Sequence, residues 1–384
     1  MNTESILYIV NDCGFTGDAG RFIRQSAVLL RRAGFRVDCC FMNPAGDDML
    51  FREGFDRIFH VEDLRMFSSG YDLAILHKIP AFSVLKDLES VFGGRLIFWA
   101  HDHEACCPAR NRRSPICGGD CTSPFHPVRC TCCVLPAMLG RGMEGLREMK
   151  TFFLEENKKL ELLSSHPAVV PSGFMRRILL KNGFPPENVV VIHPFVKTSE
   201  RKTPFLPDGT VRILFSGQLI RENGCDLLIR ALAHADFPFM LKIAGDGNER
   251  RRLESLVSKL NLSDRIIFSG NLPDPEILPD EPDLAVFPFR WQEPFGFAGL
   301  EASARGVPVV AFNTGGVSEW LKDGVNGFRI PPGNTDALAN GISHAAALRF
   351  RLEQMGAEGI RLAECDFSGE QFLSAFKKLL EKTK

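Results

Sequence analysis

Two glutamates, Glu293 and Glu301, have the spacing that points most directly to chemistry in this chain, with seven residues between them. The intervening segment 294–297 (PFGF) predicts a tight turn into a helix that begins near Gly296 or Phe297. Such a turn directs free backbone N–H groups and the positive end of a helix dipole at one point, which suits a phosphate. A carboxylate on the first turns of the helix can accept two hydrogen bonds from a vicinal diol. Phosphate donors between two diol-binding acids indicate a nucleotide sugar, with one acid on the sugar ring and the other on the ribose.

The elements that must position these residues alternate between strand-like and helical along the chain, which favours parallel sheets built from strand-helix-strand units. Apolar runs at 283–288 and 307–312 flank the two acids and predict a strand, a loop, a helix and a strand. The second half of the chain restarts with a strand at Val211–Ser216. In the first half we expect strands at Ile6–Val10, Phe35–Phe41, Arg57–Val61, Asp72–His77, Arg95–Ala100 and Val189–Ile192, and helices at about 18–32, 81–92, 142–164 and 174–182.

A chain of 384 residues is too long to fold around one hydrophobic core of ordinary size, and its length fits two domains. Two open, doubly wound sheets would each present a ligand crevice beyond the carboxyl ends of their strands. If the sheets face each other, the site is the cleft between them, where pockets usually form. The segment 194–209, rich in proline and charge, predicts a linker between a first domain at 1–193 and a second at 210–367.

The sequence around the two acids resembles the family 4 glycosyltransferases, which have the GT-B fold and retain anomeric configuration. Three segments are similar to the nucleotide-binding half of that family, namely 241–272, 282–288 and 315–338. The resemblance is dense from about 211 to 338 and thin in the first half. It implies two Rossmann-like domains that face each other across a cleft, with a terminal helix at about 368–384 that returns to the first, acceptor-side domain.

The resemblance assigns Glu293 to hydroxyls of the donor sugar and Glu301 to the ribose of the nucleotide. It also implies that the backbone amides of Phe295, Gly296 and Phe297 hold the diphosphate. The alternative is a surface loop whose acids are solvated and whose Glu301 caps a helix. The match of the flanking sequence favours the functional interpretation.

The loop that follows strand 211–216 departs from the family. After Gly217 the family usually has two basic residues that neutralise the leaving diphosphate, and this chain has Gln218 and Asn223 at those positions. Each charge-assisted contact is worth about 1.5–3 kcal/mol, so losing both would weaken binding by roughly 10²–10⁴-fold. Three arginines are available as substitutes: Arg221, Arg290 and Arg305. We expect Arg221, which is nearest in sequence, to bind the donor.

Two features of the first domain fit the same resemblance. The glycine-containing loop 14–21 follows the first strand, and the resemblance implies that its backbone, around Gly17, closes over the donor phosphate and the acceptor. His101 ends strand 95–100, where a side chain would face the cleft. It would orient the donor sugar or the attacking hydroxyl, and its ordinary pKa allows proton transfer at neutral pH. The alternative is a histidine that caps a strand.

Seven of the twelve cysteines lie between Cys106 and Cys133, within an expected insertion at about 104–134. In a reducing compartment such a cluster binds metal or remains as thiols. The two-residue gap between Cys130 and Cys133 suits one tetrahedral zinc, and Cys107 with Cys117 or Cys121 would complete the ligand set. Reduced thiols and an iron–sulfur cluster are the alternatives. No catalytic metal is expected, because the resemblance implies that helix dipoles and side chains take its place.

Composition limits the partners. A formal net charge of −1 disfavours nucleic acid, and no apolar run approaches the roughly 18–20 residues needed to span a bilayer. The segment 1–12 lacks the basic start and cleavage site of a signal peptide, so we expect a cytoplasmic protein. Between 105 and 150, seven Arg or Lys stand against three Asp or Glu. This basic segment would contact an anionic membrane at the inner face of the plasma membrane, or simply pack on its own domain.

The sequence therefore predicts a retaining glycosyltransferase of the hexosyltransferase type. It would move a sugar from a nucleotide-diphosphate sugar to a hydroxyl of a glycan or lipid-linked acceptor, in surface polysaccharide or lipid-linked glycan synthesis. Two alternatives stay open within the same fold. One is a nucleotide-sugar epimerase, and the other is a weak or inactive sugar-nucleotide-binding subunit, which Gln218 and Asn223 would permit.

Overall fold

The computed structural model describes residues 4–15, 17–43, 48–63, 70–113, 119–200, 206, 208–271 and 282–383. The chain divides into two compact units, Met1–His193 with Leu373–Lys384, and Pro194–Phe372. The segment expected to be a linker, 194–209, groups with the second unit. There the Val196 N–H donates to the Phe367 carbonyl at 2.9 Å, and the Ser199 N–H donates to the Ala304 carbonyl at 3.1 Å.

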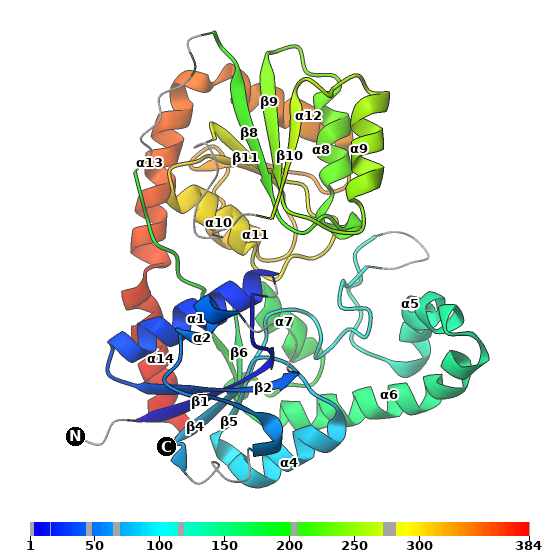
Figure 1. The fold of residues 1–384 in the computed structure, drawn as a ribbon, viewed down its shortest axis with the longest axis vertical. Coiled ribbons are helices and arrows are strands. Elements are labelled where there is room, and N and C mark those ends of the chain that lie inside the picture. The colour runs from blue at the N-terminus through cyan, green and yellow to red at the C-terminus, as the bar shows by residue number, and fades with distance from the viewer. Residues whose placement is uncertain are drawn as a thin grey trace. The chain divides into compact units, whose positions relative to one another are not determined.

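The first unit is built on a seven-stranded sheet in the order β3-β2-β1-β4-β5-β6-β7, with every neighbouring pair parallel (Figure 1). The chain order reverses between β1 and β4, so the loops after these two strands diverge and leave a crevice at the carboxyl edge. The strands are β1 (Ser5–Asp12), β2 (Arg36–Asn43), β3 (Ile58–His60), β4 (Leu73–Leu76), β5 (Leu96–Trp99), β6 (Ala168–Val170) and β7 (Val189–Val191).

The helices of the first unit have recognisable start signals. Ser172 caps α7 (Gly173–Lys181), because its side chain accepts a hydrogen bond from the Met175 N–H at 3.0 Å. The last helix, α14 (Gly369–Thr383), begins in the second unit, and its later turns pack on the first, where buried Phe376 meets the rings of Phe35 and Trp99. The other helices are α1 (Gly17–Arg32), α2 (Met49–Arg52), α4 (Phe82–Phe92), α5 (Pro127–Gly140), α6 (Gly142–Ser164) and α7 (Gly173–Lys181).

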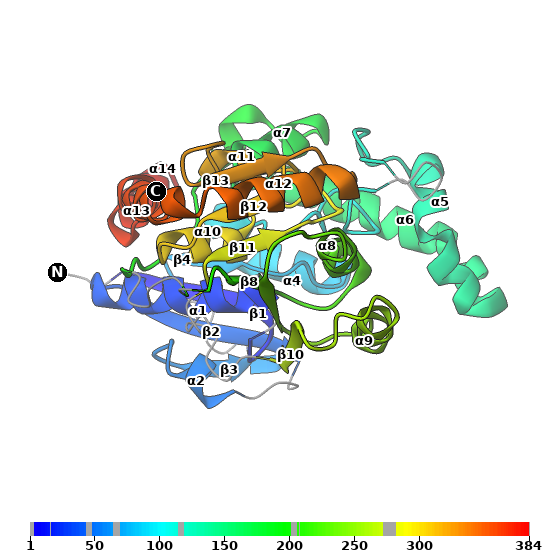
Figure 2. The ribbon, with the colours of Figure 1, turned by 90° about the horizontal axis from the view of Figure 1, so that it is seen from above.

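The last part of the cysteine-rich insertion is a helix, α5, which sequence reasoning missed. His126 caps it by accepting from the Arg129 N–H, and Pro127 occupies the first helical position, where its missing N–H costs nothing. Figure 2 shows α5 and α6 side by side. At their junction a Cβ on Gly145 would lie 2.3 Å from the Met138 carbonyl oxygen, so only glycine permits this close approach.

The second unit contains a six-stranded parallel sheet in the order β10-β9-β8-β11-β12-β13. Its order reverses between β8 and β11. The strands are β8 (Val211–Ser216), β9 (Phe239–Ala244), β10 (Ile266–Gly270), β11 (Leu284–Phe287), β12 (Val309–Phe312) and β13 (Gly327–Ile330), and the helices are α8 (Cys225–Leu232), α9 (Arg250–Lys259), α10 (Phe297–Ala304), α11 (Val317–Trp320), α12 (Thr335–Ala347) and α13 (Arg349–Asp366).

Both faces of this second sheet are buried, which explains the continuous apolar runs read from the sequence. On β11, Leu284 and Val286 join one core, whereas Ala285 and Phe287 join the other. Helices therefore cover each face, and the polar loops gather at the strand ends. Among the helices that the structure describes, none is long and apolar enough to cross a membrane.

Candidate functional site

The loops after β8 and β11 meet at the point where the strand order of the second unit reverses. Gly224, at φ 72°, closes the first loop, and a Cβ on it would lie 2.0 Å from the carbonyl oxygen of Pro288 in the second. The Arg290 N–H also donates to the Glu222 carbonyl at 2.7 Å. The two loops thus form one edge at the place where doubly wound sheets bind ligands.

Glu293 is held by its main chain and its side chain. Its carbonyl oxygen accepts from the Gly316 N–H at 2.8 Å, and a Cβ on Gly315 would lie only 1.9 Å from that oxygen. Its carboxylate accepts from the Gly296 N–H at 3.1 Å. The amide that we expected to bind a phosphate is therefore occupied by the neighbouring acid, which must rotate away before an anion can take its place.

The turn before α10 has the predicted geometry. Gly296 is the N-cap residue at φ 90°, and α10 begins at Phe297. The Phe295 carbonyl accepts from the indole N–H of Trp320 at 2.7 Å, which fixes the peptide that precedes the cap. Glu301 lies about one turn into α10 and is only 6% exposed. A solvated surface acid is therefore the wrong description of Glu301.

The polar residues of the loop after β8 support the loop itself. The side-chain amide of Asn223 donates to the Gln218 carbonyl at 2.8 Å. Gly217, at φ 147°, begins the loop, and its N–H donates to the Ala244 carbonyl of β9 at 2.9 Å. The side chain of Asn223 thus closes this loop from within.

The three arginines suggested as substitutes differ in their surroundings. Arg290 forms two hydrogen bonds to Asp226, at 2.5 and 2.8 Å. Burial alone would raise the pKa of Asp226, but the hydrogen bonds and charge of Arg290 together hold it below its ordinary value. Arg305 follows the C-terminal end of α10, opposite the predicted phosphate turn. Arg221 is exposed at the start of the short helical turn 221–223, within the loop after β8.

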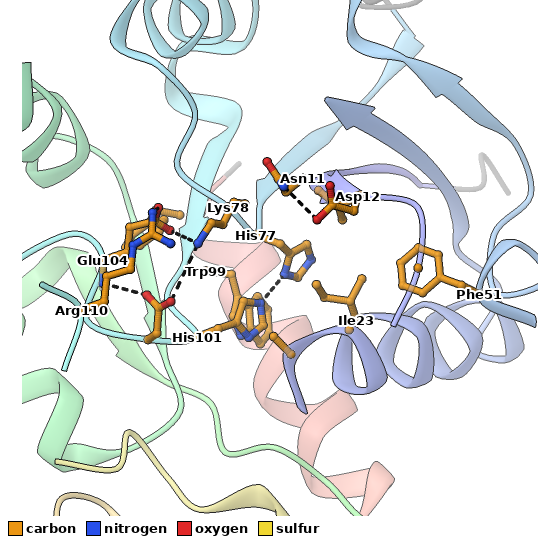
Figure 3. Close-up of a pocket in the computed structure, with 16 residues that line it drawn as sticks. Asn11, Asp12, Ile23, Phe51, His77, Lys78, Trp99, His101, Glu104 and Arg110 are labelled. Carbon is orange, nitrogen blue, oxygen red and sulfur yellow. Dashed lines mark hydrogen bonds and ion pairs between the residues drawn. The ribbon is translucent and has the colours of Figure 1, made fainter. Parts of the chain in front are cut away.

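The first unit has a cavity of about 340 Å³ at its own reversal point, between β1 and β4 (Figure 3). His101 lines it, as do Gly14 and Gly20 from the loop and first turns of α1. A Cβ on Gly20 would lie 3.0 Å from the Phe15 Cα, so the helix approaches the loop closely. Gly17 begins α1, and its contact with the donor phosphate stays a prediction. The cavity is also lined by Val10, Asn11, Asp12, Ala19, Ile23, Phe51, His77, Lys78, Phe98, Trp99, Asp102, Glu104 and Arg110.

His101 is paired with a second histidine that sequence reasoning did not assign to the site. The His77 Nδ1 and the His101 Nε2 are 2.9 Å apart, and their rings are inclined by 25°. Burial lowers the pKa of His101 to about 4, against an opposing effect of Asp102. Burial, together with His101, also lowers the pKa of His77 well below its ordinary value. The sequence could have indicated this pair by position, because His77 directly follows strand β4 and His101 stands two residues after strand β5.

A chain of charged groups forms another wall of the cavity. The Lys78 ammonium lies 2.7 Å from Glu104 and 3.9 Å from Asp102, and Arg110 reaches Glu104 at 2.5 Å. Burial raises the pKa of Glu104, and the charge of Asp102 adds to that effect. The cavity can therefore offer both hydrogen-bond donors and acceptors to a polar ligand.

The cysteines of the insertion are only partly described, because Cys117 lies outside the described residues. Cys130 and Cys133 are three residues apart on α5. Burial raises the pKa of both thiols, with neighbouring cysteine thiols among the further contributions, including that of Cys107. Over the described ranges no group of three or more His, Cys, Asp or Glu side chains is arranged to hold a metal ion. Structural zinc, with Cys121 as an alternate ligand, stays a prediction.

The comparisons with known proteins agree with the geometry of the second unit. Residues 196–361 match the family model described as glycosyl transferases group 1. This segment is therefore similar to the group 1 glycosyltransferases. An uncharacterized glycosyltransferase of Methanocaldococcus jannaschii is 35% identical to the chain over 150 residues, which is 38% of each protein. A lipopolysaccharide core biosynthesis glycosyltransferase of Rhizobium meliloti is 31% identical over 171 residues, 44% of this chain and 49% of that protein. The chain thus spans about half or less of the length of these relatives.

Solved structures share the fold of this chain over nearly its full length. Anabaena HepE, in complex with UDP and glucose, has a TM-score of 0.73 at 19% identity, covering 99% of this chain and 100% of that one. A glycosyltransferase from Rickettsia africae has a TM-score of 0.72 at 16% identity, covering 100% and 99%. These likenesses confirm the predicted GT-B class of two doubly wound, Rossmann-like units.

Proposed function

We propose that this protein is a retaining glycosyltransferase of the hexosyltransferase type that uses a nucleotide-diphosphate sugar. The observation that carries the proposal is the Glu293 turn and the N-terminus of α10, placed at the strand-order reversal of the group 1 segment. That site combines backbone donors for a diphosphate with a carboxylate for sugar hydroxyls. The complex of Anabaena HepE with UDP and glucose supports this class of donor.

Donor binding in this proposal displaces the Glu293 carboxylate from the Gly296 N–H. The diphosphate then takes that amide and the neighbouring amides of Phe295 and Phe297, and Glu293 turns to the sugar. Buried Glu301 accepts hydrogen bonds from the ribose. Arg221 supplies the positive charge that the resembling family obtains from two basic residues, at positions where this chain has Gln218 and Asn223.

The first unit contributes the acceptor side. His101 and the charged wall of the cavity orient a hydroxyl of a glycan or a lipid-linked acceptor. The sugar passes to that hydroxyl on the face that the diphosphate leaves, and an oxygen of the leaving diphosphate takes the acceptor proton. No protein nucleophile is required. Exclusion of water protects the activated sugar from hydrolysis.

The hairpin of α5 and α6 supports a further partner, an anionic membrane surface at the inner face of the plasma membrane. Val128, Leu139 and Met143 are 77%, 54% and 67% exposed, although each is a large apolar side chain. Arg129 and Arg141 lie beside them in the sequence. Exposed apolar groups flanked by basic ones favour insertion into a charged lipid interface.

Titration calorimetry with a panel of nucleotide sugars, followed by a hydrolysis and transfer assay, tests the main proposal. We expect binding of one nucleotide sugar and slow release of its sugar, faster when a suitable acceptor is present. Binding without turnover would indicate a non-catalytic subunit instead. Conversion of the sugar to its epimer would indicate an epimerase. No binding of any member of the panel would refute the assignment.

A further inference from the structure

We propose that His77 is a positioning residue that fixes the tautomer of His101, so that His101 serves its ligand as a hydrogen-bond donor and not as a general base. The inference rests on the proposed function for the role of His101. Its geometric basis is independent of that function, because it concerns two rings inside the first unit.

His77 is held firmly in the sheet. The backbone N–H of His77 donates to the Ile9 carbonyl at 2.9 Å, which ties the end of β4 to β1. Its ring lies 4.3 Å from the ring of Tyr8 and 5.9 Å from that of Trp99, measured between centroids. The side chain is only 5% exposed. Because these contacts surround the ring, His77 presents Nδ1 to His101 in a fixed direction.

The contact requires one ring to donate and the other to accept. Both rings are neutral at pH 7, since burial lowers both pKa values. Neutral imidazole carries one N–H and one bare nitrogen, so the 2.9 Å contact uses a proton from one partner only. The remaining question is which ring supplies it.

The other nitrogen of His77 answers that question. His77 Nε2 is buried and has no hydrogen-bond partner in the part of the chain that the structure describes. A buried N–H without a partner is rarer and more costly than a buried lone pair. The proton of His77 therefore belongs on Nδ1, where it is donated to the His101 Nε2. His101 then carries its own proton on Nδ1.

This tautomer decides what His101 can do in the cavity. Its Nε2 lone pair is occupied by His77, so no bare nitrogen is left to accept a proton from a hydroxyl. Its Nδ1–H is a neutral donor suited to a sugar hydroxyl or a phosphate oxygen. The charged groups that act on the ring are Asp102 and Lys78, and Tyr8 on β1 stays neutral because burial raises its pKa. Such a donor orients an oxygen without removing its proton.

Side-chain ¹⁵N NMR of the full chain, labelled at histidine, tests the inference without any substrate. The nine histidines give few enough signals to assign, and a His101→Gln sample identifies the signals of His101 by their loss. At pH 7.5 we expect both His77 and His101 in the Nδ1–H form. An Nε2–H form of His101 in the wild-type protein would overturn the proposal, whether or not the protein transfers sugar.

Two substitutions of His77 separate positioning from packing. In His77→Asn the side-chain amide can replace the Nδ1–H donor, so His101 should keep its tautomer and transfer should fall less than about threefold. In His77→Phe the donor is lost, so His101 should change to Nε2–H and kcat should fall by about tenfold. Equal losses in both variants with an unchanged His101 tautomer would refute the positioning role. If His77→Phe does not fold, the wild-type and Asn spectra still decide the tautomer.

Discussion

Replacement of Glu293 by alanine has two opposite consequences in this structure, and their combination is diagnostic. The carboxylate occupies the Gly296 N–H at 3.1 Å, so its removal frees that amide for a phosphate. It also removes the acceptor that we assign to the sugar. We therefore expect Glu293→Ala to bind a nucleoside diphosphate as tightly as the wild type or more tightly, and to lose nearly all sugar transfer.

The expected loss of transfer rate in Glu293→Ala follows from the removal of one charge-assisted hydrogen bond. Such a bond contributes about 1.5–3 kcal/mol, which corresponds to roughly 10- to 150-fold in rate if it is made to the sugar in the transition state. Retention of more than about a tenth of the wild-type rate would therefore contradict the role of Glu293. The freed Gly296 amide should, by contrast, maintain or raise the affinity for the nucleoside diphosphate alone.

Calorimetry with the nucleoside diphosphate and a transfer assay with the nucleotide sugar measure the two effects separately. Glu293→Gln is the matched control, because its side-chain oxygen can still accept from the Gly296 N–H while the charge is lost. It should keep the thermal stability of the wild type and lose transfer. If Glu293→Ala loses diphosphate affinity and thermal stability together, the residue only supports the turn, and the reasoning fails.

The other predictions concern charge, protonation, metal and lipid. Arg221→Ala should weaken donor binding by about tenfold or more, and an unchanged affinity in calorimetry would mean that another group neutralises the diphosphate. The pKa of His101 is about 4 in the folded protein and ordinarily about 6.5. The unfolded chain therefore binds the extra proton as the pH falls from about 6.5 to 4, and the contribution of His101 to the free energy of unfolding should decrease over that window by up to about 1.4 kcal/mol per pH unit. Urea unfolding at several pH values should show a smaller decrease in His101→Gln, and the same slope in both proteins would contradict this. Metal analysis of purified protein should find zinc held by the cysteine-rich insertion, and less than about 0.2 zinc per chain would count against the structural site. Wild-type protein should sediment with vesicles that contain anionic lipid, and the double variant Leu139→Ser with Met143→Ser should remain in the supernatant, whereas equal sedimentation would exclude this hairpin as the contact.

The sequence by itself determined the succession of elements. The strand expected at Val211–Ser216 and the helix expected at 142–164 have the same bounds in the structure, because apolar runs and helical periodicity are local properties of the chain. Glycine at 296 also predicted where α10 begins, since a turn before a helix favours a residue that can adopt a positive φ. Shorter signals failed. The strand β6, Ala168–Val170, has only three residues and was not expected, nor was the helix α5 inside the cysteine-rich insertion.

Tertiary structure alone decided which groups meet. His77 and His101 are 24 residues apart in the chain and come together because β4 and β5 are neighbours in the sheet. Arg290 and Asp226 are 64 residues apart, and no local pattern in the sequence indicated that they pair. Such pairings depend on strand order and on the close approach of loops. Local periodicity contains no information about either, so they emerge only when the whole sheet is assembled.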